Sequence, residues 1–398
     1  MKLNIKKILS YFGFGIVFVL VVILLIKFNK SESEDNKSQQ VLTLFNWGEY
    51  LDPQTIIDFE KETKIKVKQV LFSSNELAVT KIKSHNKYDL AILSEYAIDQ
   101  LIQADFLEKI DKDKLKEKEE KEKEYYSDSQ YNDKYKEINK KLPNNFADYA
   151  VPYFWGKVVL VYNKNKIKKK EIEDKGFKIL KDAKLKVALC NNSRDSLMIG
   201  LKANGLSIDN LTPEDLKKAK NWILDLKKEK SDVAFINDQL IDRMLQKNQE
   251  YYDVAVAYSG DAKFLKEKND NLDFISPKEG TNIWVDALVM PKESKKDLAY
   301  QFITFLREKN NYNKNLKYVK YDSPYKNNEN NEIEIKEKED QVYKYDENNQ
   351  KLINTYWNDI IAYPSKKDYW LFVLSTLIVI SIFVWYVINK LSNNYIRI

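Results

Sequence analysis

Residues 41–53 read VLTLFNWGEYLDP, and this stretch predicts a strand, a loop and a helix in immediate succession. The apolar run from Val41 to Phe45 is typical of a short buried strand. Asp52 and Pro53 match a helix N-cap followed by proline at the first helical position. A strand that leads directly into a helix is the repeating unit of α/β proteins, so this stretch places the chain in that class.

The loop between that strand and that helix carries two aromatic rings and one carboxylate, supplied by Trp47, Tyr50 and Glu49. Open α/β sheets bind their ligands outside the carboxyl ends of the strands, which is where this loop lies. Aromatic faces attract cations and bury apolar groups, and a carboxylate pairs with a cation. The loop therefore predicts a ligand that is both cationic and partly apolar.

Strands and helices alternate over most of the remaining chain. We predict an α/β fold with largely parallel sheets, since such alternation is typical of that architecture. The further strands that we expect cover residues 65–71, 88–93, 158–162, 185–190, 233–236, 253–258 and 283–290. The helices that we expect cover residues 74–84, 95–104, 193–204, 213–230, 238–246 and 297–309.

Each end of the chain carries a long apolar segment, Ile8 to Ile26 and Tyr369 to Ile388. Each is long enough for a transmembrane helix, which takes about 20 residues. A cleaved signal peptide is the alternative for the first, but its apolar core is long and no cleavage site of small residues follows it. We expect an uncleaved anchor at the cell membrane, with the region between the two segments on the extracellular face.

The composition excludes several classes of function. The 398 residues include one cysteine, Cys190, and one histidine, His85, so a disulfide framework and a Cys/His zinc site are impossible. The net charge of +6 comes from interleaved acidic and basic residues, which argues against nucleic-acid binding. No phosphate-binding loop is present. We expect no cofactor and no enzymatic activity, with a carboxylate pair as the catalytic alternative that the sequence leaves open.

Other strand ends carry the same kinds of residue as the first loop. Ser94 and Tyr96 follow the strand at 88–93, and Tyr258 ends the strand at 253–258. Trp284 and Asp286 lie two apart in an apolar strand, so both point to one face. A buried carboxylate without a partner is costly, and for this reason Asp286 is the strongest single candidate for binding a cation.

The order of these segments resembles the spermidine/putrescine-binding proteins of ABC transporters. The resemblance runs from about Val41 to Tyr363 and implies a two-lobed fold of the periplasmic-binding-protein type (type II), with two chain crossings between the lobes. The pieces that carry it are LFNWGEY at 44–50, FEKETKIKV at 59–67, SNE at 74–76, YDL at 88–90, VPYFWG at 151–156 and IWVDALVMP at 283–291.

The resemblance implies a polyamine in the cleft, with rings on its methylenes and carboxylates on its ammonium groups. The implied site consists of Trp47, Glu49, Tyr50, Ser94, Tyr96, Asn192, Asp195, Tyr258, Trp284, Asp286 and Tyr321. Trp357 or Asn358 matches, more loosely, a polar contact that comes late in the sequences of the family. Asn192 departs from the family, which has an acidic residue there. Because a charge-assisted hydrogen bond is roughly twice as strong as a neutral one, we expect weaker polyamine binding or a less charged ligand.

The implied domain boundaries follow from this match. Two charged segments, at 116–141 and 326–351, interrupt it and are expected to be solvated insertions. The expected units are a tail at 1–7, an anchor at 8–27, a linker at 28–40, lobe 1 at 41–150 and 284–315, lobe 2 at 151–283 and 316–365, a transmembrane helix at 369–388 and a tail at 389–398.

The expected partners are a polyamine (spermidine or putrescine), the membrane and the permease subunits of an ABC importer powered by a separate ATPase, with no nucleic acid. Two alternatives remain open at this point. In the first alternative, the chain binds another organic cation. In the second, the chain uses the same fold as a surface adhesin or scaffold and has no transport function.

Overall fold

The computed structural model describes six stretches of the chain. They are residues 40–230, 233–237, 239–246, 252–326, 333–364 and 366–395. The expected N-terminal anchor at Ile8 to Ile26 and most of the linker lie outside them.

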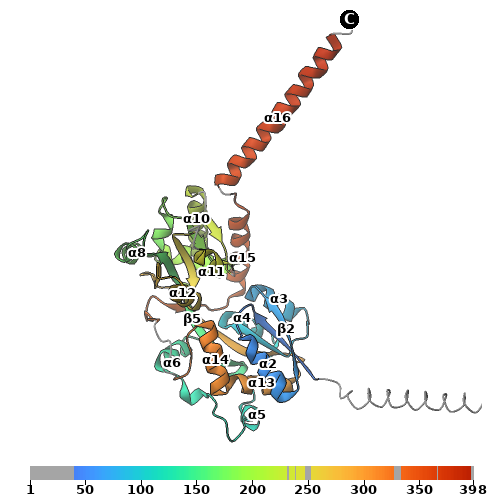
Figure 1. Cartoon of the computed structure of the whole chain (residues 1–398), viewed down its shortest axis with the longest axis vertical. Coiled ribbons are helices and arrows are strands. Elements are labelled where there is room, and N and C mark those ends of the chain that lie inside the picture. The colour runs from blue at the N-terminus through green and yellow to red at the C-terminus, as the bar shows by residue number, and fades with distance from the viewer. Residues whose placement is uncertain are drawn as a thin grey trace, which may run out of the picture.

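Lobe 1 is built on one half of a long twisted sheet (Figure 1). Its strand order is β2 (Lys66–Phe72), β1 (Val41–Trp47), β3 (Leu90–Ser94), β10 (Asn282–Pro291) and the first half of β5 (Ala150–Asn163). The pairs of β1 with β2 and β3 are parallel, whereas β10 runs antiparallel to β3 and β5. The predicted α/β class is confirmed, but β10 and β5, at the centre of the sheet, pair antiparallel with each other and with their other neighbours in the strand order, β3 and β8 (Val254–Tyr258).

Helices cover both faces of the lobe 1 sheet. The helix after β1, α2 (Pro53–Thr63), begins as the sequence predicts, because the Asp52 carboxylate accepts a 2.9 Å hydrogen bond from the Gln54 amide. The other helices of lobe 1 are α3 (Asn75–Lys83), α4 (Glu95–Gln103), α5 (Lys112–Glu117), α6 (Asp133–Asn139), α7 (Phe146–Tyr149), α13 (Lys296–Arg307) and α14 (Lys309–Val319).

Lobe 2 continues the same sheet from the second half of β5. Its order is β8 (Val254–Tyr258), β6 (Val187–Leu189) and β7 (Val233–Phe235), with β9 (Leu272–Ile275) also paired to β5. Its helices are α8 (Lys169–Lys175), α9 (Ser193–Ala203), α10 (Pro213–Glu229), α11 (Leu240–Leu245), α12 (Ser259–Lys268) and α15 (Glu347–Ala362). Each lobe has its own hydrophobic clusters, so each is a packed unit.

Two long strands join the lobes. All 14 residues of β5 are buried, and its first half pairs with β10 while its second half pairs with β8 and β9. The chain then passes between the lobes a third time, from α14 in lobe 1 to α15 in lobe 2. Where these segments meet, the Lys157 ammonium pairs with the Asp340 carboxylate, and both side chains are fully buried.

The two charged segments are more ordered than expected. In 116–141 the side chains of Tyr126, Tyr135 and Ile138 are buried, and the last two lie on α6. In the described part of 326–351, Ile333 and Tyr343 are buried. The expectation of fully solvated insertions is therefore wrong for these side chains, because aromatic residues spaced among the charges pack against the lobes.

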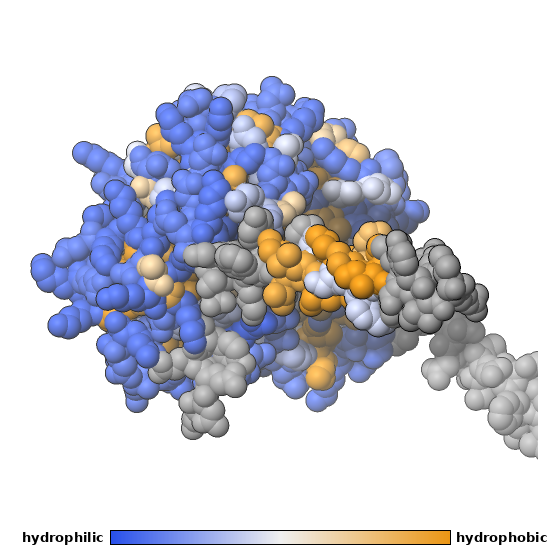
Figure 2. Space-filling model, turned by 90° about the horizontal axis from the view of Figure 1, so that it is seen from above, coloured by the Kyte–Doolittle hydropathy of each residue, from blue (hydrophilic) through white to orange (hydrophobic). Residues whose placement is uncertain are grey.

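The last helix, α16 (Lys366–Tyr395), leaves lobe 2 beyond α15 and extends away from the rest of the molecule (Figure 1). Its described apolar side chains are exposed, for example Phe383 and Trp385 at 65% each, and they form the apolar surface seen over this helix in Figure 2. No helix among the described residues meets the length and apolarity of a membrane span. The expected transmembrane helix at 369–388 is thus not confirmed.

Candidate ligand-binding cleft between the lobes

Asp286 is the most deeply placed carboxylate of the predicted site. It lies on β10, is 4% exposed, and accepts a 2.6 Å hydrogen bond from the Ser94 hydroxyl at the end of β3. Burial raises the pKa of Asp286 from 3.8 to about 6, and the neighbouring Ser94 and Tyr50 hydroxyls partly offset that rise. The Tyr50 hydroxyl faces this carboxylate without a hydrogen bond of ordinary geometry. Asp286 is therefore a carboxylate whose charge a cation would stabilise.

Four aromatic side chains from both lobes form a row of ring contacts beside this position, and Tyr50 and Tyr321 interact with the Asp286 carboxylate. The Tyr50 and Tyr321 ring centroids are 5.6 Å apart, those of Tyr321 and Trp284 are 4.8 Å apart, and those of Trp284 and Tyr258 are 6.2 Å apart. The last two pairs are edge to face, with interplanar angles of 88°. Such a set presents both ring faces and ring edges, which is the lining that methylenes and ammonium groups prefer.

Two glycines allow these rings to approach the backbone. A Cβ atom at Gly156 on β5 would overlap the Trp284 indole, and one at Gly260 on α12 would overlap the Tyr321 ring. Neither glycine has a positive φ, so the requirement is one of space alone. The position of the aromatic wall thus depends on residues that carry no side chain.

Asp195 is the carboxylate that lobe 2 contributes. It lies in the first turn of α9 and is 8% exposed. Its Oδ2 accepts 2.8 Å hydrogen bonds from Asn192 and Tyr258, and its Oδ1 accepts one of the same length from Asn282. Burial raises the pKa of Asp195, and these three donors oppose the rise. Asn192 also caps the N-terminus of α9, because its Oδ1 accepts a 2.8 Å hydrogen bond from the Asp195 backbone amide.

A hydrogen-bonded network links Asp286 to the opening of the cleft. The Asn75 side chain donates to Ser94 at 2.9 Å and to the Tyr96 hydroxyl at 3.1 Å. The Tyr96 hydroxyl in turn donates to Glu76 at 3.2 Å. Asn75 and Glu76 lie in the SNE piece at 74–76, so sequence reasoning noted the segment but did not place these residues in the site.

Glu95 is a second buried carboxyl that sequence reasoning missed. It is the first residue of α4 and is fully buried. Its carboxylate accepts a 2.9 Å hydrogen bond from the Val285 backbone amide. Burial raises the pKa of Glu95 to about 8, and the nearby Asp286 charge raises it further. Its other oxygen has no hydrogen-bond partner among the described residues. The residue lies between Ser94 and Tyr96, and only this tertiary position distinguishes it from an ordinary first-turn glutamate.

The first loop of the predicted site separates into two environments. Tyr50 joins the aromatic wall, whereas the half-buried Trp47 packs on Phe72 with ring centroids 4.5 Å apart. Glu49 is exposed, has a φ of 51°, and accepts a 2.5 Å hydrogen bond from Tyr318 of α14. Contacts within the set thus link eight of the eleven predicted residues, and Tyr96 is joined to Ser94 through Asn75. Trp47 and Glu49 lie apart from them.

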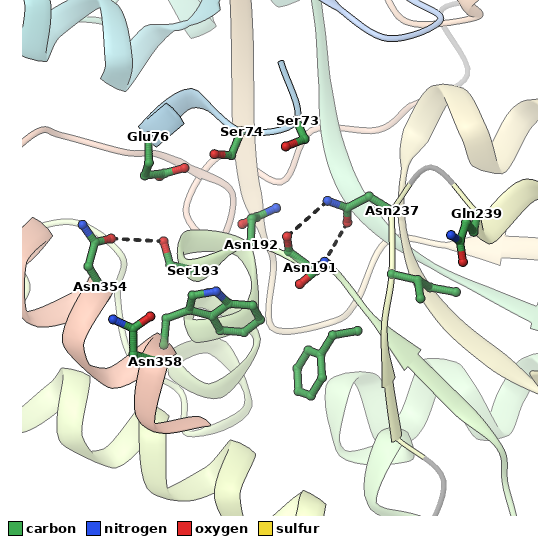
Figure 3. A pocket seen from close by; sticks show the side chains of 13 residues that line it. Ser73, Ser74, Glu76, Asn191, Asn192, Ser193, Asn237, Gln239, Asn354 and Asn358 are labelled. Atoms are coloured by element: carbon green, nitrogen blue, oxygen red, sulfur yellow. Dashed lines mark hydrogen bonds between the residues drawn. The ribbon is translucent and has the colours of Figure 1, made fainter. Parts of the chain in front are cut away.

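A cavity of about 590 Å³ opens beside this set (Figure 3). Lobe 1 lines it with Ser73 and Ser74, between β2 and α3, and with Glu76 in the first turn of α3. Lobe 2 lines it with the end of β7 and with residues that follow β6 and β7. Helix α15 adds Asn354, Trp357 and Asn358. Asn192 is shared by the cavity and the predicted site, so the two are continuous at that residue.

One arginine bridges the lobes next to the cavity. The Arg194 guanidinium on α9 lies 4.0 Å from the centre of the Tyr96 ring of lobe 1 and 5.0 Å from that of Tyr343. A guanidinium over an aromatic face contributes about 0.5–2 kcal/mol. This contact fixes how the two lobes lie in the structure described here.

Two lobes around a shared sheet, with aromatic rings and carboxylates facing a cleft between them, define a two-lobed ligand-binding protein. The model of the bacterial extracellular solute-binding protein family matches residues 54–340, and the chain belongs to that family.

Known relatives agree with this assignment. The spermidine/putrescine-binding periplasmic protein of Escherichia coli strain K12 is 28% identical over 280 residues, which cover 69% of this chain and 74% of the relative. The putrescine-binding periplasmic protein PotF of the same strain is 30% identical, with 67% and 73% covered. The solved structure of the spermidine/putrescine ABC transporter substrate-binding protein PotD of Streptococcus pneumoniae is 28% identical, with 81% and 98% covered and a TM-score of 0.62.

Proposed function

We propose that the chain is the substrate-binding component of an ABC importer for polyamines, and that it binds spermidine or putrescine in the cleft between its lobes. The observation that carries this proposal is Asp286, a buried carboxylate with a raised pKa beside a cluster of four aromatic rings. The names of the relatives in Escherichia coli and Streptococcus pneumoniae support the same ligand class.

The chemistry of a polyamine fits these residues. Each methylene group that is buried between the rings contributes about 0.8 kcal/mol. Each ammonium over a ring face adds about 0.5–2 kcal/mol. Asp286 would hold one ammonium, and Asp195 would hold another at the lobe 2 side of the cleft. The separation of the two carboxylates then selects ligand length.

Closure of the lobes would couple binding to delivery. The Arg194–Tyr96 contact and the strands β5 and β10 connect the lobes, so ligand contacts on both sides would favour a closed form. We propose that this closed form docks on a permease with a separate ATPase, and that the role is one of binding without catalysis. The apolar segment at 8–26 and the exposed apolar side chains of α16 support a tether at the cell membrane, on its extracellular face.

Titration of the full-length chain with spermidine and putrescine tests the proposal. The chain is kept in a mild detergent because of the apolar surface of α16. We expect saturable heat at micromolar or lower ligand concentrations and a rise in the thermal midpoint. Neither heat nor a thermal shift at millimolar ligand would rule out the polyamine assignment. The tether is tested separately, by membrane fractionation of the full chain and of a chain that ends at residue 364.

A further inference from the structure

The cavity beside the aromatic site has a lining of its own. Its volume of about 590 Å³ falls in the range of small-molecule sites, and its walls come from both lobes. It shares Asn192 with the implied polyamine site, and it also contains Trp357 and Asn358, which match the family's contacts more loosely. Asn192 donates to Asp195 and to the Tyr258 hydroxyl, so the cavity begins where the predicted carboxylate site ends.

The polar lining of this cavity is almost entirely neutral. Among the described residues, six side-chain amides and three serine hydroxyls line it, together with one carboxylate, that of Glu76. The Glu76 carboxylate already accepts a hydrogen bond from the Tyr96 hydroxyl. An ammonium group only donates hydrogen bonds and brings a charge, whereas an amide side chain offers both donors and an acceptor. The lining therefore complements a neutral group that both donates and accepts better than it complements a second or third ammonium.

Helix α15 supplies two of these amides. The Asn354 side-chain oxygen accepts hydrogen bonds from Gln350 at 2.9 Å and from Ser193 at 3.5 Å, and Figure 3 shows this oxygen directed toward Ser193. No hydrogen bond of the Asn358 side chain is found among the described residues, and Figure 3 shows it on the same wall. Trp357 and Phe235, with ring centroids 5.4 Å apart, add an apolar surface that suits a methyl group.

We propose that the preferred ligand is a mono-acylated polyamine, whose free ammonium end pairs with the buried carboxylates and whose amide end lies in this cavity. This inference rests on the proposed function and names the ligand class more narrowly. The amide carbonyl accepts from Asn358, and the acyl methyl packs on Trp357. An unmodified polyamine of the same length places a cation among neutral amides, whose NH₂ groups cannot bond to it, with Glu76 as the one carboxylate among the described lining residues.

Isothermal titration of the full-length chain in mild detergent, at pH 8, tests the inference. The ligands are spermidine, its N1-acetyl and N8-acetyl derivatives, putrescine and N-acetylputrescine. We expect one acetylspermidine isomer to bind about ten-fold more tightly than spermidine. A lower Kd for either isomer than for spermidine supports the inference, and an equal or higher Kd for both overturns it. If none of the five amines binds, the proposed function itself fails, which is a distinct result.

Two variants locate the preference in the cavity. Asn192→Asp adds a carboxylate at the start of the cavity and should shift the preference toward unmodified spermidine by ten-fold or more. Asn358→Ala changes an exposed side chain, so folding should be retained, and it should raise the Kd of the acetylated ligand about five-fold. Thr355→Ala, an exposed change on α15 outside the lining, is the matched control and should change neither Kd. An unaltered ratio of the two Kd values in both cavity variants would overturn the inference.

Discussion

The Ser94 hydroxyl donates a 2.6 Å hydrogen bond to the Asp286 carboxylate, and the two residues are register partners on the antiparallel strands β3 and β10. The pairing joins the first α/β units of lobe 1 to a strand that arrives nearly 200 residues later in the chain. It holds one carboxylate oxygen in a fixed direction beside the aromatic cluster. A cation that enters the cleft therefore meets a carboxylate that is already positioned.

Removal of the Asp286 charge should abolish binding. Asp286→Asn keeps the size of the side chain and an oxygen for the Ser94 hydroxyl, but it cannot balance an ammonium in a desolvated site. We expect the Kd for spermidine to rise at least 100-fold, while the thermal midpoint of the empty protein stays the same or rises. Calorimetry and thermal denaturation check the two parts. Retention of the wild-type Kd would show that Asp286 is not the cation partner.

The raised pKa of Asp286 predicts how binding depends on pH. Because the carboxyl is neutral below about pH 6 in the empty protein, a cation must displace its proton there. We expect the affinity to fall about ten-fold for each unit of pH below 6, with a smaller dependence up to pH 8 from Glu95, whose pKa is about 8. Titrations between pH 5 and 9 measure this. The ten-fold loss of affinity per unit of pH below 6 should be absent in Asp286→Asn. If this pH dependence persists in the variant, another group causes it.

The same pKa predicts how the stability of the empty protein depends on pH. A carboxyl whose folded-state pKa is raised stabilises the fold fully below pH 3.8, and this contribution is lost as the pH rises to about 6. The loss corresponds to about 3 kcal/mol at 1.36 kcal/mol per unit of pKa. Urea unfolding of wild type and Asp286→Asn, compared at pH 4 and pH 7, isolates it. The free energy of unfolding of the variant, relative to that of wild type, should be higher at pH 7 than at pH 4. The same relative value at both pH values would contradict the raised pKa of Asp286.

Gly156 should be required for the aromatic wall. Gly156→Ala places a methyl group into the buried Trp284 indole, where overpacking costs about 1–3 kcal/mol. We expect that loss of unfolding free energy together with weaker ligand binding, because the indole must move. Gly48→Ala is the matched control, since a Cβ there meets nothing within 4 Å, and it should change stability by less than about 0.5 kcal/mol. If Gly156→Ala and Gly48→Ala change the stability and the ligand affinity equally, overlap with the Trp284 indole is not the cause.

The buried Lys157–Asp340 pair should be needed where the lobes join. Lys157→Met leaves the Asp340 carboxylate buried without its cation and should cost about 3–5 kcal/mol of unfolding free energy. In the double variant with Asp340→Asn, neither side chain of the pair is charged. In the wild type Asp340 accepts hydrogen bonds from the backbone amides of Thr281 at 2.9 Å and Lys336 at 2.7 Å, and the asparagine oxygen can still accept the first of them. We expect that variant to recover most of the loss in urea unfolding. A double variant as unstable as Lys157→Met would show that charge balance is not the cause.

Much of the local structure follows from residues close together in the chain. The Asp52–Pro53 start of α2, the strands at β1, β3 and β10, and the helices after them come from apolar periodicity and capping residues, and the structure confirms them. The position of Trp284 and Asp286 on one face of β10 follows from the two-residue period of a strand. The family assignment likewise rests on the order of short motifs, and the comparisons confirm it.

What the sequence by itself determined is therefore the α/β class, the family and a set of strand ends that carry rings and carboxylates. Only the tertiary structure decided which of these meet: Tyr50 turns into the cluster, while Glu49 pairs with Tyr318 at the surface. It also revealed Glu95 and the amide-lined cavity. The physical reason is that capping and periodicity act over a few residues, whereas burial, pKa and the walls of a cleft depend on segments more than 100 residues apart that only packing brings together.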